Sequence, residues 1–241
     1  MVISDHTTKA FDIDLQELTR MVAEMGGLAE KQVADAVDAL ARRDADRAQQ
    51  TVATDPDVDA LQAEIEEKAV LTIARRQPMA VDLREIVGAL RVANDLERIG
   101  DLAKNIAKRV SALDDDVQLT KVLRGVEHMS ELVLLQIKDV LDSYARRDVD
   151  KALAVWRGDE EIDAVNNSLF RELLTYMMED PRNISLCIHL LFCAKNIERM
   201  GDHATNIAET VYYIVEGRPL ADERPKGDNT ASCTLHPNKG A

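Results

Sequence analysis

The sequence predicts an all-α protein built as two tandem three-helix bundles, six long helices in all, produced by an internal duplication. Three observations support this fold class. Apolar residues recur at steps of three and four over long stretches, the pattern returns at an offset of 104 residues, and only 3% of the 241 residues are aromatic. The step size indicates amphipathic helices, and the fixed offset indicates a duplicated unit. Few aromatic residues favour packed helices over sandwiches and barrels.

The first expected helix covers about residues 10–42. Its apolar positions run from Phe11 to Leu40 in steps of three and four, which is the pattern of one buried helix face. Adding 104 to these positions gives a second stripe that ends at Tyr144. We therefore expect a matching helix at about residues 117–145.

The remaining helices follow short turns, at about residues 45–76 and 80–110 in the first unit and 149–178 and 183–216 in the second. Asp44 and Asp148 follow paired arginines and suit the N-cap position of the second helices. Pro78 and Pro181 mark the turns before the third helices, because proline ends a preceding helix. Pro56 leaves two interpretations open, a kink or a helix that restarts with Asp55 as its cap.

This organisation predicts three regions. Residues 1–112 form the first bundle, residues 117–216 form the second, and residues 217–241 form a disordered tail, because the tail is poor in large apolar residues. The acidic run Asp114–Asp116 between the bundles is interpreted as a solvated linker.

Composition excludes several classes of protein. A net charge of −14 argues against nucleic acid as a principal partner. Three cysteines without C-x-x-C spacing indicate neither a disulfide framework nor a zinc ribbon. We find no secretory signal and no run of 18 apolar residues, so we expect a cytoplasmic protein with no direct membrane insertion, peripheral to the membrane only through its partners.

One motif occurs in both units, at the third helix. Glu97-Arg98-Ile99-Gly100-Asp101 is repeated as Glu198-Arg199-Met200-Gly201-Asp202, and nine of sixteen positions are identical between residues 93–108 and 194–209. Glu and Asp four residues apart lie on one helix face, one turn above the other. Each unit therefore presents a stacked pair of carboxylates.

A second acidic pair lies at the same level of each hairpin. Asp59 is 19 residues before Pro78 and Glu97 is 19 after it, while Asp55 and Asp101 are each 23 away. Asp159 and Asp163 stand in nearly the same relation to Glu198 and Asp202 across Pro181. Equal distance from the turn means equal height in an antiparallel helix pair.

The expected sites are thus two groups of four carboxylates, which we call the first and second carboxylate groups. The first contains Asp55, Asp59, Glu97 and Asp101, and the second contains Asp159, Asp163, Glu198 and Asp202. Oxygen-rich groups of this kind suit hard cations such as Mg²⁺, Mn²⁺ or oxidised iron. The alternative interpretation is that Arg98 and Arg199 form ordinary ion pairs with these acids.

The sequence resembles the PhoU family of regulators of bacterial phosphate uptake. The resemblance spans about residues 5–218 and includes the duplication, and its matching pieces are Met25-Gly26-Gly27, Arg75-Arg76-Gln77-Pro78, Leu96 to Asp101, Tyr176 to Arg182 and Ile197 to Asp202. It implies two tandem three-helix bundles, often dimeric, with metal clusters in some members on paired Glu/Asp-x-x-x-Asp motifs. Carried over by position, these pairs are the two carboxylate groups.

The resemblance also implies a function. Members of the family couple the ATPase subunit of a phosphate ABC transporter to a phosphate-sensing histidine kinase, and they keep the phosphate-starvation response off when phosphate is plentiful. The implied protein is a negative regulator and not an enzyme, with no catalytic residues. The alternative is a metal-dependent all-α hydrolase of nucleotides or phosphate esters, because such enzymes also hold Mg²⁺ on helix-borne carboxylates.

Overall fold

The computed structural model describes residues 3–113 and 120–221. Within these residues the chain is helical, in the order α1 (Ile3–Arg42), α2 (Ala45–Ala53), α3 (Asp55–Arg76), α4 (Val81–Val110), α5 (Thr120–Arg146), α6 (Val149–Glu179) and α7 (Ile184–Glu216). The predicted acidic linker and most of the predicted tail lie outside the described residues, as do residues 117–119 of the expected fifth helix. The all-α fold class and its duplicated three-helix units are confirmed.

Each repeat has a first, a second and a third arm, which are its three helical segments in chain order. The second arm of the first repeat is divided into two helices where the sequence places Pro56. The helix stops at Ala53 and restarts at Asp55, with Thr54 between them as the N-cap of α3 and Pro56 in its first turn. The restarted helix was one of the two predicted possibilities. Its cap is Thr54, and Asp55 is the first helical residue, with a side chain directed into the protein and only 8% exposed.

The turns between the first and second arms are the same in both repeats. Asp44 and Asp148 each accept a hydrogen bond from the backbone N–H three residues later, at 3.0 Å, so both predicted N-caps are confirmed. The arginine before each aspartate has a positive φ, 54° at Arg43 and 58° at Arg147. This left-handed residue ends the preceding helix and lets the chain reverse.

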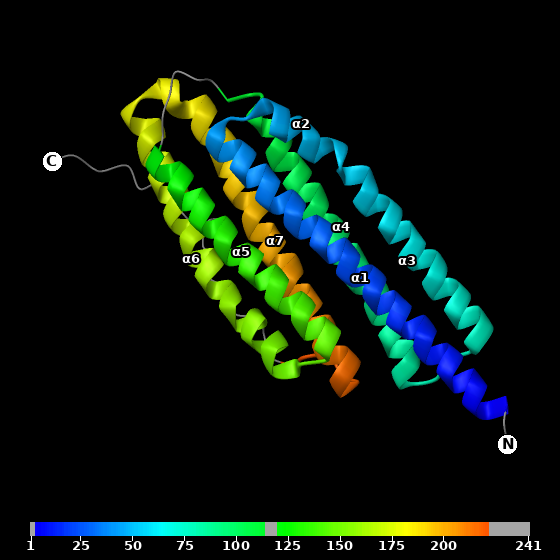
Figure 1. The fold of residues 1–241 in the computed structure, drawn as a ribbon. Helices are drawn as coiled ribbons and strands as arrows, with labels where there is room; N and C mark the ends of the chain where they lie inside the picture. Colours follow the sequence, from blue (N-terminus) through cyan, green and yellow to red (C-terminus); the bar gives the residue numbers. More distant parts are fainter. Residues whose placement is uncertain (1–2, 114–119, 222–241) are drawn as a thin grey trace.

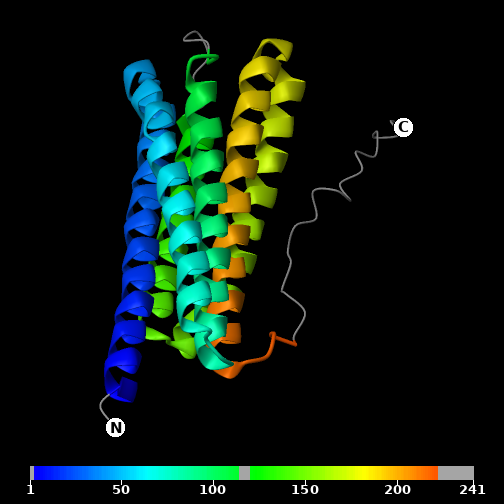
Figure 2. The same ribbon diagram turned by 90° about the vertical axis from the view of Figure 1, so that its right-hand side faces the viewer.

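The two repeats pack side by side, and the long helices run along a common axis (Figures 1 and 2). In Figure 1, α3 and α6 lie at opposite edges, while α4 packs against α7 and α1 against α5. Helices α4 and α7 are antiparallel, because Asp95 contacts Asn206 whereas Arg109, nearer the end of α4, contacts Phe192. The interface between repeats is therefore built mainly by the two copies of the third arm and the two copies of the first.

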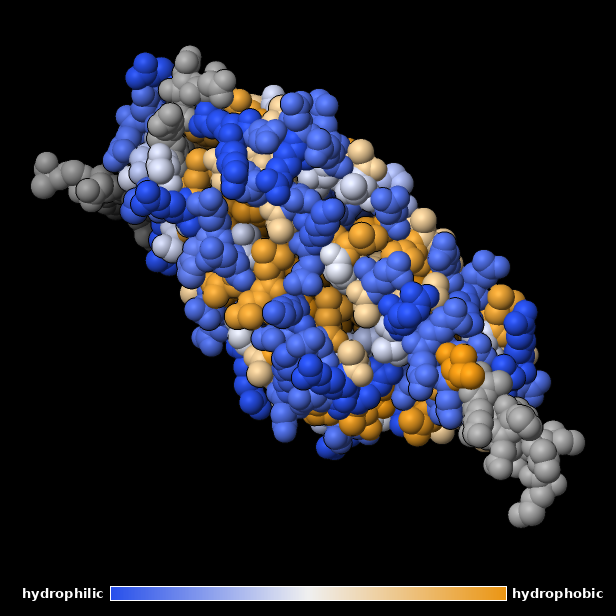
Figure 3. Space-filling view, viewed as in Figure 1, coloured by the Kyte–Doolittle hydropathy of each residue, from blue (hydrophilic) through white to orange (hydrophobic). Residues whose placement is uncertain are grey.

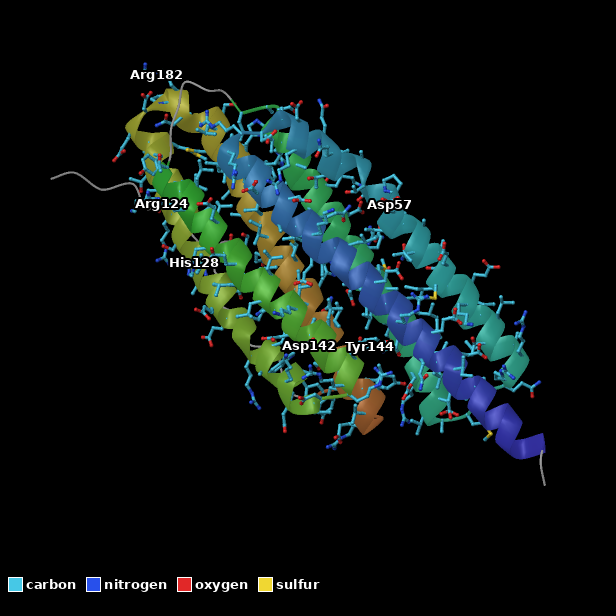
Figure 4. All side chains as sticks on the ribbon, in the orientation of Figure 1. Asp57, Arg124, His128, Asp142, Tyr144 and Arg182 are labelled. Atoms are coloured by element: carbon cyan, nitrogen blue, oxygen red, sulfur yellow. The ribbon has the colours of Figure 1, made fainter. Side chains whose placement is uncertain are left out.

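The core is aliphatic, as the composition predicts, with one large aromatic anchor at the seam between repeats. Tyr144 is 2% exposed and lies between α5 and α1 (Figure 4), where it hydrogen-bonds with Thr19. Leu18, Ile106 and Ile137 are among the fully buried side chains, each of which contributes roughly 1.5–3 kcal/mol on burial. Figure 3 shows hydrophilic residues over most of one face, with hydrophobic residues visible in small patches between them.

Candidate functional site

The first carboxylate group forms where α3 faces α4. Lys104 of α4 donates hydrogen bonds to Asp55 Oδ2 at 2.6 Å and to Asp101 Oδ1 at 2.5 Å, so its ammonium joins the two arms. The negative charge of Asp59 raises the pKa of Glu97, which places these two side chains close enough to interact. At the predicted common height, Asp55 and Asp101 therefore share a contact with Lys104 across the hairpin.

The pKa values of two acids in the first group, Glu97 and Asp101, are shifted in opposite directions. Burial, and then the charge of Asp101, raises the pKa of Glu97. Burial acts in the same direction on Asp101, but the hydrogen bond from Lys104 outweighs it and lowers the pKa of Asp101. The hydrogen bond between Glu97 and Asp101 also contributes, because it raises the pKa of Glu97 and lowers that of Asp101.

Two cations accompany the first group. Burial lowers the pKa of Lys104, but its hydrogen bonds to Asp101 and Asp55 outweigh burial and raise the pKa above its ordinary value. Arg98 Nη1 lies 3.4 Å from Asp101 Oδ2, and Arg98 Nε lies 3.2 Å from Glu97 Oε2. The ion-pair interpretation of Arg98 is thus correct for this group, and Lys104, which we did not predict, is the more buried of the two cations.

The second carboxylate group lies where α6 faces α7 and is more deeply buried. Asp159, Asp163 and Glu198 are 2%, 4% and 5% exposed. Thr205 donates a hydrogen bond to Asp159 Oδ1 at 3.3 Å, and Lys195 donates one to Glu198 Oε1 at 2.9 Å. Burial raises the pKa of Glu198 against the hydrogen bond from Lys195, and the charges of Asp202 and Asp163 raise it further. The charges of two of the other three acids therefore act on Glu198.

Sequence reasoning missed one further pair of residues, the buried glutamines Gln32 and Gln136. They lie on α1 and α5 at the repeat offset of 104, and they are 3% and 9% exposed. A Cβ added to Gly100 would meet Gln32 Oε1 at 2.7 Å, and one added to Gly201 would lie 3.5 Å from Gln136 Oε1. Gly100 therefore leaves room for the amide of Gln32, whereas the nearest atom to a Cβ on Gly201 is Ile162 Cδ1, at 3.1 Å.

The amides of these glutamines are incompletely satisfied. Gln32 Oε1 and Nε2 and Gln136 Oε1 have no hydrogen-bond partner. The same holds for Glu198 Oε2, and Glu97 Oε2 has no hydrogen bond although Arg98 Nε lies 3.2 Å from it. Buried polar atoms without partners are uncommon in proteins and call for a water, an ion or another explanation. The signal in the sequence was present, because a glutamine lies beside the apolar stripe at the same place in both repeats.

The oxygen atoms of these side chains can be compared with the ligands that a bound cation requires. Carboxylate and amide oxygens are suitable ligands for a hard cation, and the unpaired buried oxygens could accept one. As the side chains stand, however, no three His, Cys, Asp or Glu residues in the described ranges 3–113 and 120–221 are arranged to hold a metal. A cation would have to draw the carboxylates together. In the first group it would also have to displace Lys104.

A cavity of about 700 Å³ lies elsewhere, between α4 and α7. Its wall includes Asp95, whose Oδ1 lies 2.9 Å from His203 Nδ1 and accepts a hydrogen bond from Asn206 at 3.3 Å. These contacts join the two repeats. His203 therefore belongs to the interface between repeats and not to the neighbouring carboxylate group, as its direction on the helix predicts.

The fold and these contacts define a class of protein: an all-α chain of two repeated three-helix units, each with a group of carboxylates between its second and third arms. A sequence profile for the PhoU domain matches the chain twice, at residues 22–110 and 126–211. The chain belongs to the PhoU family.

Individual relatives match over nearly the whole chain. A protein of Rhizobium meliloti is 58% identical over 94% of this chain and 96% of its own length, and one of Caulobacter vibrioides is 52% identical over 94% and 98%. Both are named phosphate-specific transport system accessory protein PhoU homolog.

Two solved structures share the fold. The crystal structure of PhoU from Pseudomonas aeruginosa has a TM-score of 0.83 at 41% identity, covering 86% of this chain and all of that one. The phosphate transport system regulatory protein PhoU from Streptococcus pneumoniae has a TM-score of 0.82 at 28% identity, covering 87% and 99%. Among the described helices of the present chain, none combines the length and the apolar character that crossing a bilayer requires.

Proposed function

We propose that this chain is an accessory protein of a phosphate transport system, which regulates phosphate uptake and keeps the phosphate-starvation response off when phosphate is plentiful. The observation that carries the proposal is the 58% identity over 94% of the chain to a relative named phosphate-specific transport system accessory protein PhoU homolog. A match of this extent includes both repeats and both carboxylate groups, so the resemblance is not confined to a shared fold.

The mechanism we propose is that of an adaptor. The chain binds the ATPase subunit of the phosphate transporter and a phosphate-sensing histidine kinase, from the cytoplasm, and works as a dimer. The acidic, largely hydrophilic surface supports a role in contact with other proteins in water, since the net charge is −14. Sedimentation measures the dimer, and capture of the tagged chain from phosphate-replete cells identifies the partners. Recovery of neither the ATPase nor the kinase would overturn the adaptor role.

The regulatory role is tested in the source organism. Deleting the gene should turn a phosphate-starvation reporter on in phosphate-rich medium, and the wild-type gene should turn it off again. A reporter that stays off in the deletion strain contradicts the proposal.

The enzyme alternative is tested by incubating the protein with nucleoside triphosphates and phosphate esters in Mg²⁺ or Mn²⁺. Hydrolysis that is lost in Asp202→Asn would favour a hydrolase.

The carboxylate groups supply a second component of the proposal, the binding of a divalent or trivalent cation such as Mg²⁺, Mn²⁺ or iron. The residues that would hold it are Asp55, Asp59, Glu97 and Asp101 in the first group and Asp159, Asp163, Glu198 and Asp202 in the second. When bound, such a cation would supply positive charge that holds α3 to α4, or α6 to α7. Glu198 Oε2, which is buried without a hydrogen-bond partner, supports this role. Metal analysis of protein purified without chelator tests it.

A further inference from the structure

The outer face of the α4–α7 pair, which is the side away from α1 and α5, has two ends that can be compared residue by residue. The cavity of about 700 Å³ lies at one end, and no residue of α1 or α5 lines it. Eighteen residues, or five whole helical turns, separate Arg91 of the cavity wall from Arg109, and Thr210 of the wall from Phe192. Arg109 and Phe192 therefore lie on the same side of the helix pair, at what we call the phenylalanine end.

The two ends have opposite shapes. At the phenylalanine end, Ile188 and Phe192 lie one turn apart on α7 and are 39% and 49% exposed, and the Arg109 guanidinium lies 4.3 Å from the centre of the Phe192 ring. The repeat offset of 101 places Arg91 at the position of Phe192 and Thr210 at that of Arg109, and there the same place is hollow. Neighbouring exposed apolar side chains mark interaction surfaces.

The two ends also have opposite charge. Residues 102–113 and 181–197, which include the phenylalanine end, contain five Lys and Arg residues and no Asp or Glu. Residues 81–95 and 205–216, which include the cavity end, contain five Asp and Glu residues and two arginines. Opposite charges favour the approach of one end to the other when the two ends belong to different copies of the chain.

Charged groups at both ends lack an ionic partner within the chain. Arg109 forms no ion pair in the described ranges 3–113 and 120–221, and its Nε is buried without a hydrogen-bond partner. On the cavity wall, Glu209 accepts a hydrogen bond from Trp156 at 3.1 Å and forms no ion pair in the same ranges. Arg91, the one cation among the residues that line the cavity, lies over the Tyr213 ring at 5.1 Å. Each end therefore has charge that a second molecule can balance.

The spacing of the two ends suits a two-fold symmetric dimer. Phe192 lies nine residues before Gly201 and Thr210 lies nine after it, so each end is about 13–14 Å from the same level of α7. Rotation by 180° about an axis perpendicular to the helices at this level exchanges the two ends. A second copy placed in this way presents its phenylalanine end to the cavity of the first, and its cavity to the phenylalanine end of the first. Such a self-complementary surface is an isologous interface.

We propose that the outer face of α4 and α7 is the dimer interface of this chain, with Phe192 of each copy seated in the cavity of the other. This inference rests on the dimer of the proposed function, and it names the surface and the antiparallel arrangement of the two copies. A cavity of about 700 Å³ has room for an aromatic side chain and its neighbours. Buried aromatic anchors of this kind carry much of the binding energy of an interface.

The experiment blocks each end separately and then mixes the two variants. Phe192→Asp removes the apolar anchor, and Asn94→Trp places a large side chain at the exposed rim of the cavity. Neither variant has an intact contact in its own homodimer, so dimerisation of each should weaken roughly thirtyfold or more.

A mixture of the two variants keeps one intact contact. The Asn94→Trp chain supplies Phe192, and the Phe192→Asp chain supplies an open cavity. We therefore expect mixed dimers at concentrations where each variant alone is monomeric. Sedimentation velocity measures them, with a fluorescent label on one of the two variants.

A matched control is Leu135→Asp. Leu135 is 57% exposed, close to the 49% of Phe192, but it lies on α5 and not on the outer face. This variant should dimerise like the wild type. Its dissociation would mean that any added surface acid weakens association, and it would overturn the proposal.

The remaining outcomes also decide the question. A dimer of Phe192→Asp alone, or a mixture that stays monomeric, would overturn the arrangement, with circular dichroism as the check that the variants are folded. If Asn94→Trp does not fold, Phe192→Asp and Leu135→Asp still test the phenylalanine end. A monomeric wild type would overturn this inference and the dimer of the proposed function together. The reporter assay is a separate measurement, so a failure of the regulatory role is recognised independently.

Discussion

The first and second carboxylate groups share a duplicated motif, but different residues contact their acids. In the first, Lys104 bridges Asp55 and Asp101, and the charge balance is part of the chain itself. In the second, three acids are nine-tenths or more buried, and the facing residue is Thr205. The acidic residues are repeated, but the lysine that contacts them is not: it is Lys104 in the first group and Lys195, at the position of Asn94, in the second.

The interface between repeats shows a second asymmetry. Gly88 lies against Ile214 of α7, whereas its counterpart at the repeat offset is His189, which lies 3.5 Å from Arg109. Burial raises the pKa of the nearby Cys193 thiol to about 12, so it is a core residue and not a nucleophile at neutral pH. One side of the α4–α7 contact is thus close apolar packing, and the other holds a polar pair.

The largest difference between repeats is expected from removing their lysines in metal-free protein. Lys104→Met leaves two carboxylates, one of them buried, without their cation, and should lower the free energy of unfolding by about 3 kcal/mol. Lys195→Met removes a pair whose lysine side chain is 44% exposed and whose glutamate side chain is 6% exposed, and it should cost less, roughly 1–2 kcal/mol, because solvent screens the lysine. Urea unfolding in a chelator measures both. Equal losses would mean that the two groups are electrostatically alike.

The second test concerns the part of the α4–α7 interface where Gly88 packs closely against Ile214. A Cβ on Gly88 would lie 2.7 Å from Ile214 Cγ1, and Ile214 is a stiff β-branched residue with 2% exposure. Gly88→Ala should therefore cost roughly 2 kcal/mol of stability through overpacking. Gly27→Ala is the control, since nothing lies within 4 Å of its Cβ position. This control should stabilise α1 by up to about 1 kcal/mol, and a loss of stability there would contradict the packing argument.

A third test uses the pH dependence of the second group. Glu198 has a raised pKa because burial disfavours its charge, so the folded state holds its proton more tightly than the unfolded state. Its ionised form therefore lowers stability above the raised pKa, and Glu198→Gln should raise metal-free stability at pH 7 by about 1 kcal/mol. The gain should shrink as the pH falls toward the ordinary value of 4.5, where wild-type Glu198 is itself protonated. Thermal unfolding at a series of pH values measures this, and a gain that grows on acidification would refute it.

The smallest difference between the repeats is expected at the two aspartate N-caps. Asp44 and Asp148 cap their helices with the same geometry, so Asp44→Ala and Asp148→Ala should each cost about 1 kcal/mol. Differential scanning calorimetry of the two variants should give matching shifts. Clearly unequal shifts would show that the difference between repeats extends beyond the carboxylate groups and the α4–α7 interface.

The features predicted correctly are those that depend on local or periodic patterns. The helices, the two aspartate caps and the equal height of the acidic pairs follow from spacing along the chain. The role of Lys104 was not predicted, although its position three residues after Asp101 placed it on the same helix face. The buried amides of Gln32 and Gln136 depend on packing between the first and third arms, which periodicity within one helix does not describe.

The antiparallel contact of α4 with α7 has a consequence for the symmetry of the molecule. Asp95 meets Asn206, and shifting both positions by the repeat offset gives Asn196 and Asn105, which an antiparallel pair again places opposite one another. A surface that maps onto itself in this way is the surface of a two-fold symmetric dimer. One polypeptide therefore has the internal arrangement of a two-fold symmetric dimer. Because both halves belong to one chain, a substitution can occur in one half alone, whereas a homodimer carries each substitution twice.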